Sequence, residues 1–217
     1  MINDIRKASE ISSEILGKCI NNFEKFKTEK DVVKWLIKKT NEKNVKLAFP
    51  PLIVSGKNFL EIHHKSDNTE LKGFVILDFG VRYGRYCGDI TRMAYKGKPS
   101  QKDLELYNFI LRIHKTTIKE MRVGMNCFEL DMMVRDGYGK NRKKFKHSLG
   151  HGVGRRIHQS PWIKPSSKHK FNEKDVVTIE PGWYSKSKGL RIEDTIFLTK
   201  DKKEILTKLS YDLKILD

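Results

Sequence analysis

Apolar and polar residues alternate in the N-terminal part of the chain with the period of amphipathic helices. In the first segment, the apolar residues at helical intervals are Ile5, Ala8, Ile11, Ile15, Ile20 and Phe23. After a break at "FKT", the segment "EKDVVKWLIKKT" continues the helical pattern, and Thr28 and Asp31 have the spacing of a capping box. The pattern predicts two helices at the start of the fold.

The pattern then changes to short apolar runs that predict strands. "PPLIVSG" and "FVILDFG" are two such runs, and the second continues into "VRYGRYCGDITRM". Gly84 in this stretch predicts the turn of a hairpin, because glycine adopts the backbone conformations that tight turns require. We expect the return strand of this hairpin to carry Asp89.

A second helical pattern follows near residue 100. Its apolar stripe consists of Leu104, Tyr107, Ile110, Leu111, His114 and Ile118. "GMNCFELDMMV" predicts another helix, in which Asn126 and Glu129 are spaced like Thr28 and Asp31. "VVTIEPGWY" and "LRIEDTIFLT" then predict strands, so each half contains a long helix, a capped shorter helix and strands.

This weak internal duplication indicates a pseudo-twofold α+β fold with a site where the halves meet. No linker rich in Gly, Pro or Ser divides the chain, so we expect a single domain over residues 1–217. A hydrophobic fraction of 38% in 217 residues is sufficient for a core.

The charge of the chain is strongly positive, with 44 Lys and Arg against 27 Asp and Glu and a net charge of +17. The lysines are scattered through polar stretches such as "NRKKFKH", without an RNA-reading signature, so we interpret most of them as solvated surface and do not expect a nucleic-acid partner. Three cysteines outside any CxxC pattern predict no disulfide framework and a cytoplasmic location. No apolar run is long enough to predict a membrane span.

Four carboxylates interrupt the apolar strand sequences. They are Asp78, Asp89, Glu180 and Glu193. Each one alone is explained by a strand end that faces water. If the four converge, however, burial and mutual repulsion prevent all of them from ionising unless cations are present.

His151 lies between glycines in "SLGHGVGRRIHQSPW" and could be a buried core residue, a metal ligand or a catalytic acid. Four carboxylates and one imidazole have a formal charge of minus four, which two divalent ions would neutralise. An oxygen-rich set of donors suits manganese, iron(II) or cobalt and does not exclude zinc. Because strand residues alternate between faces, Thr91 and Thr195 are expected to orient carboxylates, and Arg191 to hold an acid or a substrate carboxyl group.

Taken in order, these motifs resemble the "pita-bread" metallopeptidases (M24), which include methionine aminopeptidase, aminopeptidase P and Xaa-Pro dipeptidase (prolidase). The motifs that carry the resemblance span the chain: "IRKASEISSEIL", "IVSG", "LDFG", "GDITR", "HSLGHGVG", "TIEPGWY" and "LRIEDTIFLT". The resemblance implies a pita-bread α+β fold with pseudo-twofold halves, in which helices flank a curved, mostly antiparallel sheet. It also implies a catalytic domain without the N-terminal domain of larger relatives, acting as a monomer or homodimer.

By this resemblance, two divalent metal ions, manganese first, are bound by Asp78, Asp89, His151, Glu180 and Glu193. Asp89 and Glu193 would bridge the ions, and the glycines beside His151 would let metal and substrate approach the backbone. A metal-bridging hydroxide would be the nucleophile, and Glu180 would also carry a proton to the leaving nitrogen.

The resemblance also implies roles for further polar residues. His63 and His158 would contact the substrate and stabilise the tetrahedral intermediate. His64 is an alternative to His63, because the family has proline before this histidine and this chain has Ile62. His147 and Arg191 would bind substrate.

The motifs "IEPGWY" and "RIEDT" resemble those of the proline-specific branch of the family. We therefore expect a metallo-exopeptidase that hydrolyses the Xaa-Pro bond at the N-terminus of short peptides. A methionine aminopeptidase-like activity is one alternative. The other is a non-catalytic relative that binds nucleic acid or the ribosome, which would account for the positive charge.

Overall fold

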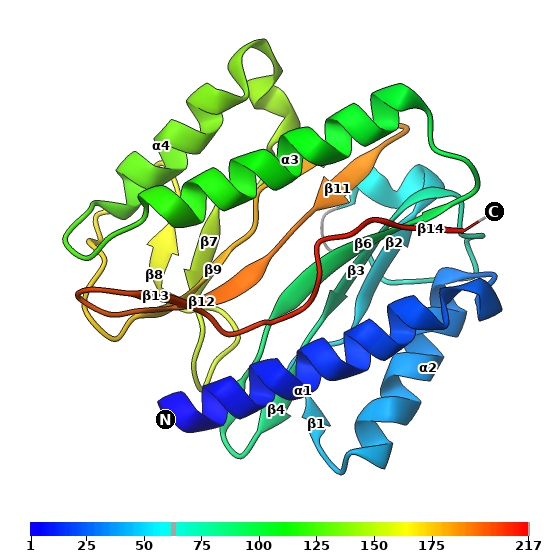
Figure 1. Cartoon of the computed structure of the whole chain (residues 1–217), viewed down its shortest axis with the longest axis horizontal. Coiled ribbons are helices and arrows are strands. Elements are labelled where there is room, and N and C mark those ends of the chain that lie inside the picture. Colours follow the sequence, from blue (N-terminus) through cyan, green and yellow to red (C-terminus); the bar gives the residue numbers. More distant parts are fainter. Residues whose placement is uncertain (62–63, 217) are drawn as a thin grey trace.

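The computed structural model describes residues 1–61 and 64–216. Figure 1 shows two pairs of helices on either side of curved β-sheet, with the early pair in blue and the later pair in green. The helices are α1 (Ile2–Asn21), α2 (Glu29–Glu42), α3 (Gln101–Glu120) and α4 (Cys127–Gly137). Short 3-10 helices are η1 (Phe23–Lys25), η2 (Gly56–Leu60) and η3 (Gly139–Lys144).

The strands fall into two groups along the chain. The first group comprises β1 (Lys46–Leu47), β2 (Leu52–Ser55), β3 (Gly73–Phe79), β4 (Val81–Tyr83), β5 (Tyr86–Cys87) and β6 (Ile90–Lys96). The second group comprises β7 (Gly150–Gly152), β8 (Gln159–Ile163), β9 (Val176–Ile179), β10 (Gly182–Tyr184), β11 (Gly189–Arg191), β12 (Asp194–Leu198), β13 (Lys203–Ile205) and β14 (Lys214–Leu216).

The main sheets of the two halves have corresponding strand orders. One sheet has the order β14-β6-β3-β2, and the other has the order β13-β12-β9-β7-β8. In both, a long antiparallel pair lies at the centre, β3 with β6 and β9 with β12. An antiparallel bridge between Thr91 and Glu193 joins the halves. The expected pseudo-twofold α+β architecture is therefore confirmed.

The helix caps differ from the prediction in one of the two halves. Thr28 and Asp31 form the expected capping box, because the Thr28 side chain accepts from the Asp31 amide and the Asp31 side chain accepts from the Thr28 amide. The prediction of a second box at α4 was wrong. Asn126 occupies the N-cap, but its side-chain amide donates to Glu129 Oε1 at 2.7 Å, and within the described part of the chain its side chain accepts no cap bond.

The second capping box belongs instead to α3, where the sequence analysis did not place one. The Ser100 hydroxyl accepts from the Asp103 amide at 3.2 Å, and Asp103 Oδ2 accepts from the Ser100 amide at 3.0 Å. Each half of the fold therefore has one helix with a closed capping box, but the two helices are not equivalent in order.

The strands expected to run through the carboxylates are broken at three of them. Asp89 separates β5 from β6, Glu180 separates β9 from β10, and Glu193 lies between β11 and β12 as an isolated bridge. Only Asp78 lies inside a strand. The chain changes its pairing partners at these breaks, since β10 and β11 form their own two-stranded sheet.

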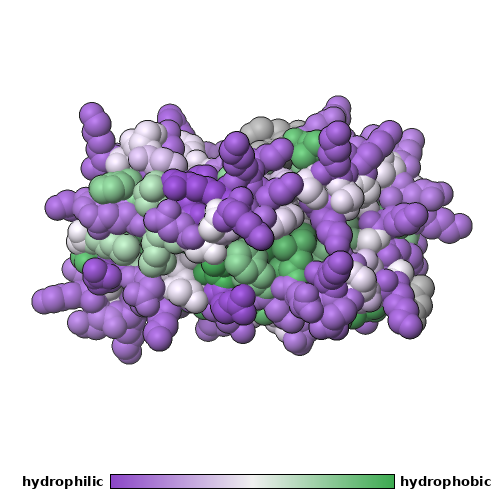
Figure 2. Space-filling view, turned by 90° about the horizontal axis from the view of Figure 1, so that it is seen from above, coloured by the Kyte–Doolittle hydropathy of each residue, from purple (hydrophilic) through white to green (hydrophobic). Residues whose placement is uncertain are grey.

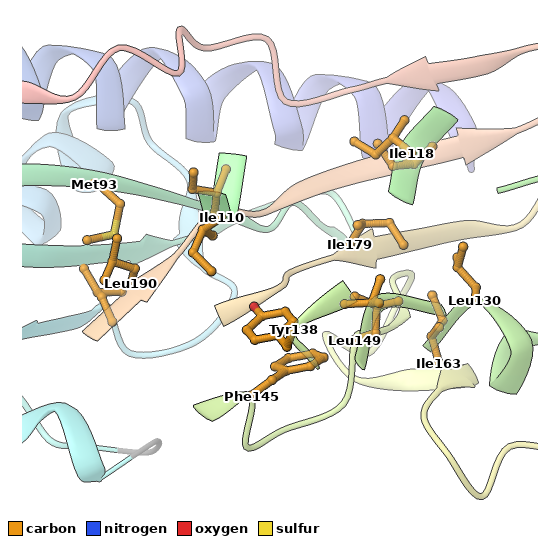
Figure 3. Close-up of a cluster of buried hydrophobic side chains, with 14 of the residues drawn as sticks. Met93, Ile110, Ile118, Leu130, Tyr138, Phe145, Leu149, Ile163, Ile179 and Leu190 are labelled. Carbon is orange, nitrogen blue, oxygen red and sulfur yellow. The ribbon is translucent and has the colours of Figure 1, made fainter. Parts of the chain in front are cut away.

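Two hydrophobic clusters join the helix pairs to the sheets. Ile15, Leu36 and Leu77 belong to the cluster beneath α1 and α2. Figure 3 shows the larger cluster, which unites Ile110 of α3 and Leu130 of α4 with strand residues such as Met93 of β6, Ile163 of β8 and Leu190 of β11. The three cysteines are buried free thiols.

Side chains occupy the exposed edge of β2. The Ser66 hydroxyl accepts from the Ile53 amide and donates to its carbonyl oxygen, both at 2.9 Å. The buried carboxylate of Glu29, in the first turn of α2, accepts from the Ser55 amide at 2.7 Å. These bonds satisfy backbone groups that an edge strand otherwise leaves open to another chain, and they fix α2 beside the sheet edge.

The surface of the molecule is mainly polar. Figure 2 shows hydrophilic side chains over most of one face, with hydrophobic residues exposed between them. No helix in the described ranges combines the length and the apolar character that crossing a bilayer requires.

The difference between the caps gives a first testable prediction. Ser100→Ala removes an acceptor for a helix amide, so we expect it to lower the free energy of unfolding by about 1 kcal/mol. Asn126→Ala removes no cap bond, and we expect a loss of a few tenths of a kcal/mol at most. Urea unfolding of the two variants measures both values, and equal losses would contradict the assignment.

Candidate active site

Asp78, Asp89, Glu180, Glu193 and His151 line a single cavity of about 1270 Å³. The first half contributes Asp78 and Asp89, and the second half contributes His151, Glu180 and Glu193. Asp78 reaches the cavity because side chains alternate along β3, so that Leu77 and Phe79 enter the hydrophobic cluster beneath α1 and α2. The cavity therefore lies where the halves meet, as the sequence predicted.

The side chains converge on His151. Its Nε2 atom lies 3.5 Å from Glu180 Oε1 and 3.7 Å from Asp89 Oδ2. One donor atom from each of Asp89, His151 and Glu193 lies within 4.8 Å of the other two. All three residues are buried, with exposed fractions of 5% or less. Such a group of nitrogen and oxygen donors has the spacing needed to share a metal ion.

Hydrogen bonds fix the orientation of these donors. The His151 ring uses Nδ1 for a 3.2 Å contact with the Gly152 carbonyl oxygen, which leaves Nε2 directed at the acids. The Thr91 hydroxyl donates to Glu193 Oε2 at 2.6 Å, as expected. The expectation for Thr195 was wrong, because its hydroxyl donates at 2.8 Å to the backbone carbonyl of Asp89 and not to a carboxylate.

Burial dominates the electrostatics of the site. Burial raises the pKa of Glu180 to about 8, and burial together with the neighbouring carboxylates raises the pKa values of Asp89 and Glu193 well above their usual range. Burial, followed by the charge of His158, lowers the pKa of His151 to about 3. A neutral imidazole beside carboxylates that cannot all ionise is the electrostatic state that divalent cations relieve.

Asp78 provides the direct test of whether a metal fits. Its Oδ2 atom accepts from the Arg191 guanidinium, whereas its Oδ1 atom is buried without a hydrogen-bond partner among the described residues. An unsatisfied carboxylate oxygen in a buried position is costly unless a cation binds it. The residues of the site therefore fit divalent metal ions.

Arg191 and His147 surround the carboxylates and form a connected network. Besides Asp78, the Arg191 guanidinium contacts the hydroxyls of Thr91 at 3.3 Å and Tyr184 at 3.2 Å. His147 Nε2 lies 2.7 Å from the Tyr184 hydroxyl, and its Nδ1 lies 3.6 Å from Glu180 Oε2. Arg191 thus holds an acid of the site, one of the two roles expected for it.

The remaining predicted histidines differ in position. The His158 ring lies at the cavity wall with its centroid 4.4 Å from that of His151. His63 lies outside the described residues. Its alternative, His64, also lines the cavity, but its ring is buried against Glu29, with Nε2 2.7 Å from Glu29 Oε2. His114 is buried in the core, as its place in the helical stripe predicts, and His169 is exposed.

The glycines beside His151 have a different function from the expected one. A Cβ atom at Gly150 would lie 2.0 Å from the Thr178 carbonyl oxygen, and one at Gly152 would lie 2.3 Å from that of Ser160. The backbones of neighbouring strands therefore require glycine here. The expectation that these glycines make room for metal and substrate is corrected to close packing between strands.

A polar network that the sequence patterns did not predict lies on the side of the strands opposite the cavity. Arg92 is 2% exposed, and its guanidinium donates to the carbonyl oxygens of Thr91 at 3.1 Å and Glu193 at 2.7 Å, and to the Asp194 carboxylate at 2.8 Å. It also donates to three carbonyl oxygens of the C-terminal segment, those of Thr207, Leu209 and Ser210.

Strand alternation could have revealed this network. Thr91 and Glu193 face the cavity, so their chain neighbours Arg92 and Asp194 face the opposite side. Two opposite charges at corresponding positions of two apolar strands, "ITRMAY" and "EDTIFL", indicate a buried ion pair. The Tyr211 and Thr207 hydroxyls also donate to Asp194, both at 2.6 Å.

Comparison with known proteins identifies the family. A model of metallopeptidase family M24 matches residues 3–200. The chain is a member of family M24. The Xaa-Pro dipeptidase of Pyrococcus horikoshii is 34% identical to this M24 chain over 223 residues, which cover 98% of the chain and 62% of that relative.

Solved structures of other M24 proteins share the fold. The X-Pro aminopeptidase of Thermotoga maritima superimposes with a TM-score of 0.93 at 29% identity, covering 99% of this chain and 63% of that one. The prolidase of Pyrococcus horikoshii gives a TM-score of 0.92 at 32% identity, with coverages of 98% and 63%. The chain thus spans about three fifths of the length of these relatives, and the expected pita-bread fold is confirmed.

The Arg92 network gives a second prediction. Arg92→Met leaves the Asp194 carboxylate and several carbonyl oxygens buried without their cation, so we expect the free energy of unfolding to fall by about 3–5 kcal/mol. Arg85→Met, in the exposed turn between β4 and β5, should change it by less than about 0.5 kcal/mol. Denaturant unfolding compares the two, and similar small losses would show that Arg92 is dispensable.

The acid cluster gives a third prediction, on pH. In metal-free protein, the native state still holds protons on Glu180 and its neighbours at pH 7, whereas the unfolded state has lost them. We therefore expect the free energy of unfolding to fall from pH 7 to pH 8. The buried histidines, with lowered pKa values, alter stability mainly below pH 6.5. Thermal melts in EDTA measure this decline, which saturating Mn²⁺ should remove; a flat or rising stability without metal would refute the explanation.

Proposed function

We propose that this chain provides the catalytic site of a dinuclear metal-dependent exopeptidase that hydrolyses the Xaa-Pro bond at the N-terminus of short peptides. The observation that carries the proposal is the convergence of two buried carboxylates, two half-buried carboxylates and the Nε2 atom of His151 on one cavity in a member of family M24. The names of the matched relatives, Xaa-Pro dipeptidase and X-Pro aminopeptidase, support the choice of bond.

The proposed metal-holding residues are Asp78, Asp89, His151, Glu180 and Glu193, with Asp89 and Glu193 shared between two ions. Two divalent ions bound there would lower the pKa of a water molecule and polarise the scissile carbonyl. The mostly carboxylate donors favour manganese, with cobalt, iron or zinc as alternatives. The short contact between Thr91 and Glu193 restricts rotation of a shared carboxylate before any ion arrives.

Glu180 is the proposed proton carrier. One of its oxygens faces His151 at 3.5 Å and the other faces His147 at 3.6 Å, so the carboxylate is held between two rings at the cavity wall. A carboxylate in this position can take a proton from the attacking water and deliver it to the departing proline nitrogen. Proline nitrogen needs this proton, because an unprotonated amide nitrogen is a poor leaving group.

The cationic and aromatic side chains of the cavity are the proposed substrate contacts. His158, with its ring beside His151, is placed to donate to the oxygen that becomes negative during the reaction. The Nε2 atom of His147 contacts the Tyr184 hydroxyl, and the His147 ring lines the same cavity. The roles of His63 and Arg191 in substrate binding stay predictions, and the observed contacts of Arg191 favour the positioning of Asp78.

The proposal predicts metal-dependent cleavage. Protein loaded with Mn²⁺ or Co²⁺ should bind two ions per chain and release alanine from Ala-Pro and Ala-Pro-Gly. Glu193→Gln removes one shared carboxylate, so we expect at least a hundredfold loss of metal affinity and of kcat/KM. Metal analysis of the dialysed protein and chromatography of the products measure these effects.

The matched control is Glu204→Gln, which changes a half-buried acid paired with Arg6 at 2.7 Å, away from the cavity. It should retain metal binding and cleavage. Metal-loaded protein that cleaves Met-Ala-Ser but leaves Xaa-Pro peptides intact would replace the proposal with the methionine aminopeptidase alternative. Folded protein that binds no metal but binds RNA in a salt-dependent way would favour the non-catalytic alternative.

A further inference from the structure

The cavity extends well beyond the cluster of acids. Its volume of about 1270 Å³ exceeds the range of about 300–1,000 Å³ that is usual for sites of small ligands. A dipeptide would fill only the part beside the acids. The rest of the cavity is therefore available to residues that follow the proline of a longer substrate.

The wall of this extension starts next to Asp78. Leu52, the first residue of the edge strand β2, pairs directly with Asp78 of β3. Pro50 and Pro51 precede it, and Val33 of α2 lies further along the same cavity. The two prolines have no amide hydrogen to offer a peptide backbone, so this part of the wall favours side-chain contacts over strand addition.

The charges on the wall are all of one sign. Apart from the acid cluster and Arg191, which is paired with Asp78, the charged residues that line the cavity in the described chain are Lys30, Lys34 and Lys65. All three are exposed, and none of them belongs to a salt bridge of the described residues. Once two divalent ions balance the four carboxylates, the cavity has an excess of positive charge at this wall.

The position of the lysines is fixed by the fold. Glu29, which directly precedes Lys30, binds the Ser55 amide of β2 at 2.7 Å and His64 Nε2 at 2.7 Å. The first turn of α2 is thereby attached to the sheet edge that borders the acids. Lys34 follows Lys30 by one helical turn and so extends the same side of the helix.

We propose that the wall formed by Lys30, Lys34 and Lys65 binds carboxylates of the substrate downstream of the proline, so that the chain prefers peptides of four or more residues with acidic side chains after the Xaa-Pro bond. This inference rests on the proposed function and deepens it by naming the substrate class. An exopeptidase cleaves beside the free N-terminus of its substrate, so the residues after the proline extend away from the acids, and the part of the cavity bordered by the lysines is the space assigned to them. Lysines at an exposed wall attract anions most strongly at low ionic strength.

The experiment compares matched peptides with the Mn²⁺-loaded protein. Ala-Pro-Gly-Glu-Glu-amide should be cleaved with about tenfold higher kcat/KM than Ala-Pro-Gly-Gln-Gln-amide, mainly through a lower KM, and 0.5 M NaCl should remove most of the difference. Lys30→Glu combined with Lys34→Glu should abolish or reverse the preference. Lys30 lies in the first turn of α2, where glutamate is favourable, and glutamate is a good helix former at Lys34, so this variant is expected to fold. The control Lys140→Glu/Lys143→Glu makes the same charge change in η3, outside the cavity lining, and should keep the preference.

Further comparisons show whether the wall binds a side-chain or a terminal carboxylate, and they distinguish failure of this inference from failure of the proposed function. A preference for Ala-Pro-Gly-Gln-Gln with a free C-terminus over its amide, which the Lys30/Lys34 variant loses, identifies the terminal carboxylate as a ligand of the wall. Equal cleavage of the acidic and neutral peptides, or equal loss of preference in both double variants, overturns this inference and leaves the Xaa-Pro activity intact. Failure to cleave any Xaa-Pro peptide overturns the proposed function itself.

Discussion

The burial of four carboxylates at one point is the constraint on which this structure depends. Asp78, Asp89, Glu180 and Glu193 come from both halves of the chain and meet around His151. Burial raises the pKa values of all four carboxylates, repulsion between neighbouring carboxylates adds to this at Asp89, Glu180 and Glu193, and one oxygen of Asp78 has no hydrogen-bond partner among the described residues. The two halves are therefore joined by a site that is electrostatically complete only when it contains divalent metal.

A second network of buried charged residues lies on the opposite side of the strands from this site. The bridge between Thr91 and Glu193 carries a proposed metal ligand on one face, and Arg92 with Asp194 occupies the other. Arg92 also ties the C-terminal segment to the bridge, and Figure 1 shows that segment (red) crossing between the helix pairs. The geometry of the acids thus depends on a well-bonded arginine that does not touch the cavity.

The same cavity contains the residues proposed for the reaction and those proposed for substrate selection. Besides the acids and His151, its lining includes apolar residues before β2, two lysines of α2, and Lys65 between η2 and β3. Glu29 connects these parts, because its carboxylate caps the edge strand and holds His64. One buried acid outside the metal cluster therefore fixes the distance between the reacting centre and the basic wall.

The sequence by itself determined the elements, the duplication and the residues of the site. Helical and strand periods are local properties, and Asp78, Asp89, His151, Glu180 and Glu193 stand in motifs that can be recognised without coordinates. Only the tertiary structure decided where strands break, why Gly150 must be glycine, and that Arg92 supports Glu193, because these features depend on contacts between residues far apart in the chain. The lysines of the cavity wall were equally invisible, since a sequence with 44 basic residues does not show which of them face the same space.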